Sequence, residues 1–226
     1  RVGVNLGSLE RDLFQKYGYS PEGMVESALR HVKILEGLDF YDTVVSLKAS
    51  DVPRMVEAYR LFAAKTDYPL HLGVTEAGSK LPGSIKSAMG FGILLTEGIG
   101  DTIRVSLSEE PKEEVRAAKL ILRSLGLRKD GVEIISCPTC ARTHVNVIKM
   151  VEEIENKTEN IKKPIHVAIM GCAVNGPGES KKVDLGIVGG AGNTNLLYKQ
   201  GKIVGKVEQD KIVETLLREI EEMNKR

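Results

Sequence analysis

One segment, Thr43-Val44-Val45-Ser46-Leu47, already indicates how this chain folds. It is an apolar, β-branched run of the kind found in buried strands. Asp51 and Pro53 follow shortly after it. This pair is typical of a helix start, because an aspartate side chain caps free backbone N–H groups and proline has no N–H to leave unpaired. The segment therefore predicts a strand that leads directly into a helix.

The same order of strand and helix recurs along the first 126 residues. We expect strands over residues 2–4, 43–47, 70–74 and 103–107. We expect helices from the N-cap Ser20 to Gly37, from the N-cap Asp51 through Phe62, over 84–97 (weakened by Gly90 and Gly92) and over 112–125. This alternation predicts a parallel sheet covered by helices. About 30 residues per unit fits half of a (β/α)8 barrel, and an open doubly wound sheet is the alternative.

Polar side chains gather at or just past the ends of these strands. They are Asn5, Ser46, Lys48, Thr75, Glu76, Arg104 and Ser106. The carboxyl ends of parallel strands share one face, where ligand sites form. Lys48 and Arg104 would suit a phosphorylated or otherwise anionic substrate, and Glu76 is a candidate acid or base. The alternative is that they are ordinary polar residues of surface loops.

Residues 132–226 have a different pattern, with Lys129-Asp130-Gly131 as the expected junction. We expect strands over 132–136, 165–170 and 183–188, a hairpin over 198–207 that turns at Gln200-Gly201, and helices over 145–157 and after the cap Asp210. This pattern predicts a compact α+β domain of about 95 residues. The domains are therefore expected at 1–131 and 132–226.

The chain has three cysteines, Cys137, Cys140 and Cys172, each placed just after a predicted strand. An odd and low count argues against a disulfide framework and favours the reducing cytoplasm. Three thiolates suit an iron–sulfur cluster with one special iron, or a zinc site completed by another ligand. Inert buried cysteines and a thioredoxin-like redox pair are the weaker alternatives.

The segment Gly171-Cys172-Ala173-Val174-Asn175-Gly176-Pro177-Gly178-Glu179 is the most specific in the chain. Its glycines and proline predict a fixed, irregular loop. Glu179 could turn back as an oxygen ligand to a metal held by the cysteines. Because carboxylate is an exchangeable ligand for iron, one position would stay open for substrate.

Composition excludes several other classes of protein. The net charge is +1, which argues against nonspecific nucleic-acid binding. The longest apolar run, Val167–Val174, has eight residues, whereas a membrane-spanning helix needs about 20. The four histidines, His31, His71, His144 and His166, do not pair with cysteine at zinc-finger spacing, and we interpret them as structural.

Five motifs together resemble the 4-hydroxy-3-methylbut-2-enyl diphosphate synthases of the non-mevalonate isoprenoid pathway. The motifs are Arg1-Val-Gly-Val-Asn5-Leu-Gly-Ser, Ser46-Leu-Lys48-Ala-Ser, Gly73-Val-Thr-Glu76-Ala-Gly, Cys137-Pro-Thr-Cys140 and Gly171-Cys172-Ala-Val-Asn175-Gly-Pro-Gly-Glu179. The resemblance runs along essentially the whole chain, and the cysteine motifs are its most specific part.

This resemblance implies a TIM-type barrel domain and a smaller 4Fe–4S domain similar to sulfite and nitrite reductases. It implies reductive ring opening and dehydroxylation of 2-C-methyl-D-erythritol 2,4-cyclodiphosphate to the linear allylic diphosphate, with ferredoxin or flavodoxin as electron donor. It also implies a homodimer in which the cluster domain of one subunit closes over the barrel of its partner.

The resemblance also implies roles for particular residues. Cys137, Cys140, Cys172 and Glu179 would hold the cluster. Arg1, Asn5, Lys48, Arg104 and Ser106 would bind the diphosphate. Glu76 would transfer a proton, and Asn175 would lie beside the cluster and the substrate.

The chain departs from the family in one respect, because the family has about half a barrel before the segment that matches Arg1. We expect a fragment with unpaired sheet edges and an exposed apolar barrel interior, inactive or weakly active by itself. Two other kinds of protein stay open as alternatives. They are a noncatalytic module held together by zinc, and an electron carrier without a substrate of its own.

Overall fold

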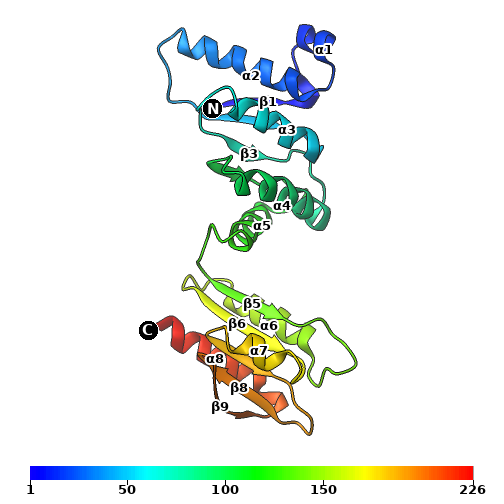
Figure 1. Ribbon diagram of the computed structural model, residues 1–226, viewed down its shortest axis with the longest axis vertical. Coiled ribbons are helices and arrows are strands. Elements are labelled where there is room, and N and C mark those ends of the chain that lie inside the picture. The colour runs from blue at the N-terminus through cyan, green and yellow to red at the C-terminus, as the bar shows by residue number, and fades with distance from the viewer. Residues whose placement is uncertain (226) are drawn as a thin grey trace. The chain divides into compact units, whose positions relative to one another are not determined.

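The computed structural model describes residues 1–225 of the chain (Figure 1). The chain divides into two compact units, Arg1–Arg128 and Lys129–Arg226. Each unit has its own sheet and its own buried apolar core. We call them the first unit and the second unit.

The first unit contains four parallel strands. They are β1 (Val2–Asn5), β2 (Val45–Lys48), β3 (His71–Gly73) and β4 (Thr102–Arg104). β1 pairs with β2 and β3 pairs with β4, while single parallel bridges, Val45 to Leu70 and Ala49 to Val74, join the two pairs. The predicted parallel sheet is thus confirmed.

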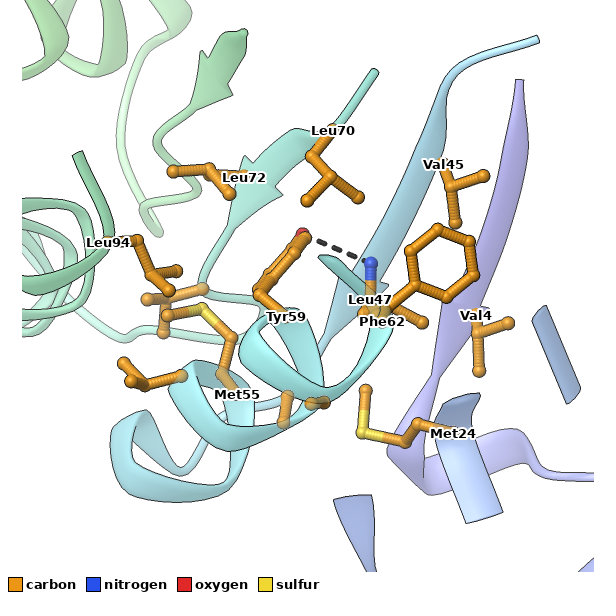
Figure 2. Close-up of a cluster of buried hydrophobic side chains, with 14 of the residues drawn as sticks. Val4, Met24, Val45, Leu47, Met55, Tyr59, Phe62, Leu70, Leu72 and Leu94 are labelled. Atoms are coloured by element: carbon orange, nitrogen blue, oxygen red, sulfur yellow. Dashed lines mark hydrogen bonds between the residues drawn. The ribbon is translucent and has the colours of Figure 1, made fainter. Parts of the chain in front are cut away.

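A tyrosine from a helix completes the join between β2 and β3. The backbone N–H of Leu47 donates to the Tyr59 hydroxyl at 3.0 Å (Figure 2). This hydroxyl donates to the His71 carbonyl at 2.6 Å. The phenol therefore stands where a direct hydrogen bond between the strands would otherwise lie. Tyr59 is fully buried, and this burial raises the pKa of its hydroxyl to about 12.

Helices α2 to α5 pack their apolar sides on this sheet. The helices of the unit are α1 (Arg11–Tyr17), α2 (Pro21–Glu36), α3 (Val52–Ala63), α4 (Lys80–Thr96) and α5 (Pro111–Ser124). The predicted N-caps are confirmed, since the Ser20 side chain accepts from Gly23 N–H and that of Asp51 accepts from Arg54 N–H. The core contains strand residues such as Leu47 beside helix residues such as Phe62 (Figure 2).

Two helix predictions in this unit need correction. Helix α1 was not expected, because Leu13 is its only buried residue and a single apolar position gives no periodic signal. Helix α4 begins at Lys80 rather than at residue 84. Its first turn contains Gly83, where a Cβ would lie 2.5 Å from Leu107 Cδ2, so this glycine marks close packing rather than a helix break.

The second face of this sheet is polar, and the expected apolar barrel interior is therefore wrong. Strand residues alternate between faces, and the positions between the core residues carry small or polar side chains. The paired positions on this face are Gly3 with Ser46, Asn5 with Lys48, His71 with Thr102, and Gly73 with Arg104. Gly3, Thr102 and Arg104 are exposed.

The second unit contains a mixed sheet of five strands. They are β5 (Val132–Ser136), β6 (Ile165–Met170), β7 (Leu185–Val188), β8 (Asn195–Lys199) and β9 (Lys202–Val207). β5, β6 and β7 are parallel, whereas β8 and β9 are antiparallel to their neighbours. The predicted hairpin at Gln200-Gly201 is confirmed, and both residues have positive φ, 46° and 77°.

Helices cover both faces of the second sheet. On one face, α6 (Val147–Thr158) and α8 (Ile212–Lys225) share a core with Val167 and Ile169 of β6. The intervening residues Ala168 and Met170 belong to a separate buried cluster on the other face. There the short helix α7 (Gly176–Ser180) packs on β6 and β7.

Two predictions in this unit are wrong in detail. Asp210 does not cap the last helix, because it lies inside a 3-10 turn, Gln209–Lys211, that precedes α8. The segment 171–179 is not irregular throughout, since its second part begins α7 with Pro177 in the first turn. Proline fits there because the first N–H groups of a helix have no partner within it. Among the helices within residues 1–225, none has the length and apolar character needed to cross a membrane.

Candidate functional site

The first candidate site lies on the polar face of the first sheet, toward the carboxyl ends of its strands. Asn5 and Lys48 are paired positions at the ends of β1 and β2, and Arg104 ends β4 opposite Gly73. A Cβ on Gly73 would lie 3.6 Å from Lys48 Cγ, so the lysine side chain packs over Gly73. Glycine at this position thus leaves room for the Lys48 stem between β2 and β4.

Three cations act on one imidazole of this face. The pKa of His71 is lowered, first by burial of the ring and then by the positive charges of Arg1, Arg104 and Lys48. His71 Nδ1 lies 2.7 Å from Thr102 Oγ1. Its Nε2 is buried and, within residues 1–225, has no hydrogen-bond partner. The face is therefore electropositive, and it suits a polyanion.

Sequence reasoning gave His71 only a structural role. The strand register places His71 on the same face of the sheet as Lys48 and Arg104, which makes it part of this site. The signal that could have found it is the alternation in Leu70-His71-Leu72-Gly73, where the apolar residues face the core and the others face away.

The other residues predicted for this site are Asn5, the last residue of β1, and Glu76 and Ser106, which lie in the loops after β3 and β4. The Asn5 side chain accepts a hydrogen bond from Gly7 N–H at 3.0 Å and so caps the 3-10 turn Leu6–Ser8. Glu76 is exposed and has φ of 51°, a left-handed conformation that is uncommon for a residue with a side chain. Ser106 is half-buried just past β4. Glu76 is thus an exposed carboxylate on a strained backbone conformation.

The second candidate site is formed by the cysteine segments of the second unit. Cys137 follows β5, and Cys172 lies just beyond β6, which is parallel to β5 and paired with it. The backbone N–H of Gly171 donates to Cys137 Sγ at 3.1 Å. The sulfur of one cysteine therefore lies against the residue that precedes another.

Cys140 lies in a tight turn that contacts Gly171. Thr143 N–H donates to the Cys140 carbonyl at 3.0 Å, and His144 N–H donates to the Gly171 carbonyl at 2.9 Å. The pKa of the Cys140 thiol is lowered, chiefly by a hydrogen bond from the Arg142 backbone and then by the Arg142 and Thr143 side chains. These contacts favour the thiolate, which is the form that binds metals.

The fourth predicted ligand, Glu179, lies in α7, which packs on β6 and β7. Its Oε1 is 3.4 Å from Lys182 Nζ. Asn175 immediately precedes this helix. Among the described residues 1–225, no three His, Cys, Asp or Glu side chains are already gathered as a metal site.

The cysteine segments nevertheless fit a thiolate-bound metal centre by their chemistry. Cys137 is half-buried and accepts a backbone N–H, which is how thiolates are stabilised in iron–sulfur proteins. Cys140 is exposed, Cys172 is half-buried, and all three are free thiols. The donor set of three sulfurs and one carboxylate suits a soft metal such as zinc or clustered iron.

Comparison with known proteins gives the same division of the chain. Residues 1–119 match the family described as "GcpE TIM-barrel domain", and residues 133–222 match the one described as "GcpE protein C-terminal domain". The chain belongs to the GcpE family. Its first unit is therefore part of a TIM-barrel domain rather than an open doubly wound sheet.

Similar curated members of the GcpE family carry one name, "4-hydroxy-3-methylbut-2-en-1-yl diphosphate synthase (flavodoxin)". The protein of Caldanaerobacter subterraneus subsp. tengcongensis is 57% identical over 226 residues, which is 100% of this chain and 63% of that protein. That of Ruminiclostridium cellulolyticum is 57% identical over 224 residues, or 99% of this chain and 63% of that protein. That of Geobacillus thermodenitrificans is 54% identical over 224 residues, or 99% and 60%. The chain thus spans slightly less than two thirds of these relatives.

Proposed function

We propose that this chain supplies the substrate and cluster sites of a 4-hydroxy-3-methylbut-2-enyl diphosphate synthase. The observation that carries this proposal is the 57% identity of the whole chain to a relative of that name. The reaction takes 2-C-methyl-D-erythritol 2,4-cyclodiphosphate, two electrons and two protons, opens the ring and releases one hydroxyl as water. The product is the linear allylic diphosphate.

The polar face of the first sheet binds the diphosphate in this proposal. Arg1, Lys48 and Arg104 neutralise its charge, and Asn5 and Ser106 add hydrogen bonds at the strand ends. The proximity of these three cations to His71, whose pKa they help to lower, supports this role, because like charges gathered on one face attract a polyanion. Binding the diphosphate there orients the carbon skeleton for reaction.

The Glu76 carboxylate holds or delivers one of the two protons that the reaction consumes. Its exposure in the loop after β3 supports this role, since a proton donor must reach the substrate. Asn175, placed at the start of α7, would orient the substrate beside the metal centre.

Cys137, Cys140, Cys172 and Glu179 would hold a 4Fe–4S cluster. When bound, such a cluster supplies one-electron transfers that no side chain can perform. Glu179 is the exchangeable ligand of the set, because a carboxylate holds iron less firmly than a thiolate. Its pairing with Lys182 shows that this carboxylate has another partner within reach.

Three further parts of the proposal rest on the family resemblance. The second unit is similar to the domains of sulfite and nitrite reductases. Two copies of the whole protein form a homodimer in which the cluster domain of one subunit meets the barrel of its partner. Flavodoxin or ferredoxin delivers the electrons. The expectation that the 226-residue chain is inactive by itself stays a prediction.

The metal is tested by anaerobic reconstitution with iron and sulfide. We expect brown protein with absorbance near ~400 nm and with iron and sulfide bound to the cysteines. A colourless chain with one equivalent of zinc would contradict the proposal and favour the structural zinc module. Measured in a full-length protein that contains this chain, the Glu76→Gln variant is expected to keep the iron and lose turnover, whereas a pure electron carrier would be unaffected by this change.

The anion site is tested separately with inorganic diphosphate as the probe. Lys48→Ala is expected to weaken binding about tenfold or more, because it removes a charged hydrogen-bond donor. The matched control is Lys65→Ala, an exposed lysine just after α3, which should leave the affinity unchanged. Equal affinities in the two variants would remove the first sheet from the proposal.

A further inference from the structure

Thr143 lies beside two of the cysteine segments but has no role in the function proposed above. It follows Cys140 by three residues, and the two residues close one turn through the hydrogen bond from Thr143 N–H to the Cys140 carbonyl. Its neighbour His144 is tied by its backbone N–H to the Gly171 carbonyl. Thr143 thus stands between the segment that contains Cys140 and the segment that contains Cys172.

The hydroxyl of Thr143 contacts Cys140 in two ways. The backbone N–H of Cys140 donates to Thr143 Oγ1 at 3.2 Å, and the same Oγ1 lies 3.9 Å from Cys140 Sγ. A hydroxyl can accept one hydrogen bond and donate another. Because a thiolate can only accept, the hydroxyl proton of Thr143 is the donor whenever Cys140 is ionised.

The methyl group of Thr143 contacts the other cysteine segment. A Cβ added to Gly171 would lie 2.7 Å from Thr143 Cγ2, so the backbone of Gly171 approaches this methyl as closely as a glycine allows. The N–H of Gly171 is also the donor to Cys137 Sγ. The Thr143 side chain therefore contacts Cys140 through its hydroxyl. Through its methyl it contacts Gly171, which precedes Cys172 and donates a hydrogen bond to Cys137.

We propose that Thr143 is a positioning residue for the metal centre. Its methyl holds the Cys140 turn against Gly171, and its hydroxyl donates to the Cys140 sulfur when metal is bound. This inference rests on the proposed metal centre and adds to it a residue that is not itself a ligand. Such partners of metal ligands keep the ligands in place and adjust the electron density on sulfur.

Three variants separate the two halves of the Thr143 side chain. Thr143→Val keeps the shape and removes the hydroxyl, and Thr143→Ser keeps the hydroxyl and removes the methyl. Thr139→Val makes the same chemical change at an exposed threonine between Cys137 and Cys140. Each chain is reconstituted anaerobically, and two quantities are measured: the rate of iron release to a chelator and the midpoint potential of the bound cluster.

We expect Thr143→Val to release iron about tenfold faster than the wild-type chain. Its midpoint potential should be lower, because the reduced cluster, which carries more negative charge, loses a hydrogen bond to sulfur. Thr143→Ser should release iron faster but keep the wild-type potential, and Thr139→Val should match the wild type in both. The inference would be overturned if Thr143→Val matched Thr139→Val in both measurements. It would also be overturned if Thr143→Ser had the lowered potential expected of Thr143→Val.

The proposed function and this inference fail in distinguishable ways. A wild-type chain that takes up zinc and no iron contradicts the proposed function, and the role of Thr143 is then tested by the rate of zinc release. A wild-type chain that holds the cluster while Thr143→Val holds it equally well contradicts only the inference. Should Thr143→Val fail to fold, the hydroxyl-retaining Thr143→Ser still tests the packing half by iron release.

Discussion

The two sheets of this chain differ in what lies on their second face. In the first unit, that face has Ser46, His71 and Arg104 beside glycines. In the second unit, Ala168 and Met170 occupy that face and α7 packs there. The comparison teaches that one sheet leaves its second face polar and partly exposed, as the proposed diphosphate site requires, whereas the other covers that face with the helix that contains Glu179.

The largest expected effect comes from adding one methyl group to each second face. A Cβ on Gly186 of β7 would lie 2.6 Å from the Ser180 side chain, whereas a Cβ on Gly3 of β1 would meet nothing within 4 Å. Gly186→Ala should therefore lower the free energy of unfolding of the second unit by about 2–3 kcal/mol, because α7 must move. Gly3→Ala should change that of the first unit by less than about 0.5 kcal/mol.

Hydrogen exchange of strand amides, read for each unit during denaturant titration, measures both changes. If Gly3→Ala were as damaging as Gly186→Ala, the second face of the first sheet would be packed, and the contrast between the sheets would be lost.

The next effect concerns the buried phenol that joins β2 to β3. Tyr59→Phe leaves Leu47 N–H and the His71 carbonyl without their partner, which should cost the first unit about 1–3 kcal/mol. Tyr41→Phe changes an exposed tyrosine and should cost nothing measurable. The second sheet, continuous by backbone pairing, should be unaffected by either change in the same hydrogen-exchange measurement.

The same phenol makes the stability of the first unit depend on pH in the alkaline range. Burial raises the pKa of Tyr59 from its ordinary value of 10.0 to about 12, so the folded state holds this proton more tightly than the unfolded state does. The resulting stabilisation is fully present below pH 10 and is lost as the pH rises from 10 to 12. Tyr59→Phe should lack this component, and unfolding midpoints across that range measure the difference. Parallel pH curves for the two proteins would contradict it.

Loss of a helix N-cap should have a smaller effect on stability, and this effect should be the same in the two units. The side chains of Asp51 and Asn146 each cap a helix, by accepting from Arg54 N–H at 2.9 Å and Lys149 N–H at 3.1 Å. Replacing either by alanine should lower the stability of its own unit by about 1 kcal/mol. Denaturant unfolding checks this. A large difference between the two variants would mean that the caps also make contacts beyond their helices.

The smallest effect tests the charge on the open face of the first sheet. The pKa of His71 lies below its ordinary value because of burial and of Arg1, Arg104 and Lys48. A bound anion offsets these charges, so inorganic diphosphate should raise this pKa, and Lys48→Ala should raise it without diphosphate. Proton NMR titration of the imidazole measures both. Lys65→Ala, which changes an exposed lysine just after α3, is the control and should leave the pKa of His71 where it is.

Local signals in the sequence were sufficient for much of the fold. The caps at Ser20 and Asp51 and the turn at Gln200-Gly201 each depend on a few neighbouring residues, and all three are confirmed. Helix α1 was not predicted because it buries only Leu13, and the start of α4 was predicted at residue 84 rather than at Lys80, which leaves Gly83 outside the predicted helix. The close contact with Leu107 that requires this glycine comes from a distant part of the chain.

The candidate sites show the same limit. Spacing placed Cys137 and Cys172 after strands, as the structure has them. Nothing in the spacing could show that Thr143 packs on Gly171 or that three cations act on His71, because both depend on how separate segments come together. The polar second face was missed because polarity was considered only at the strand ends.

The inserted phenol has a consequence for how the first unit could be divided. Tyr59 belongs to α3, whereas its acceptor on His71 lies beyond the connection at residues 64–70. A cut within that connection would leave β1, β2 and α3 in one piece and β3 and β4 in the other. Reassociation of the two pieces would restore this hydrogen bond together with the bridges Val45 to Leu70 and Ala49 to Val74, so Tyr59→Phe should weaken it.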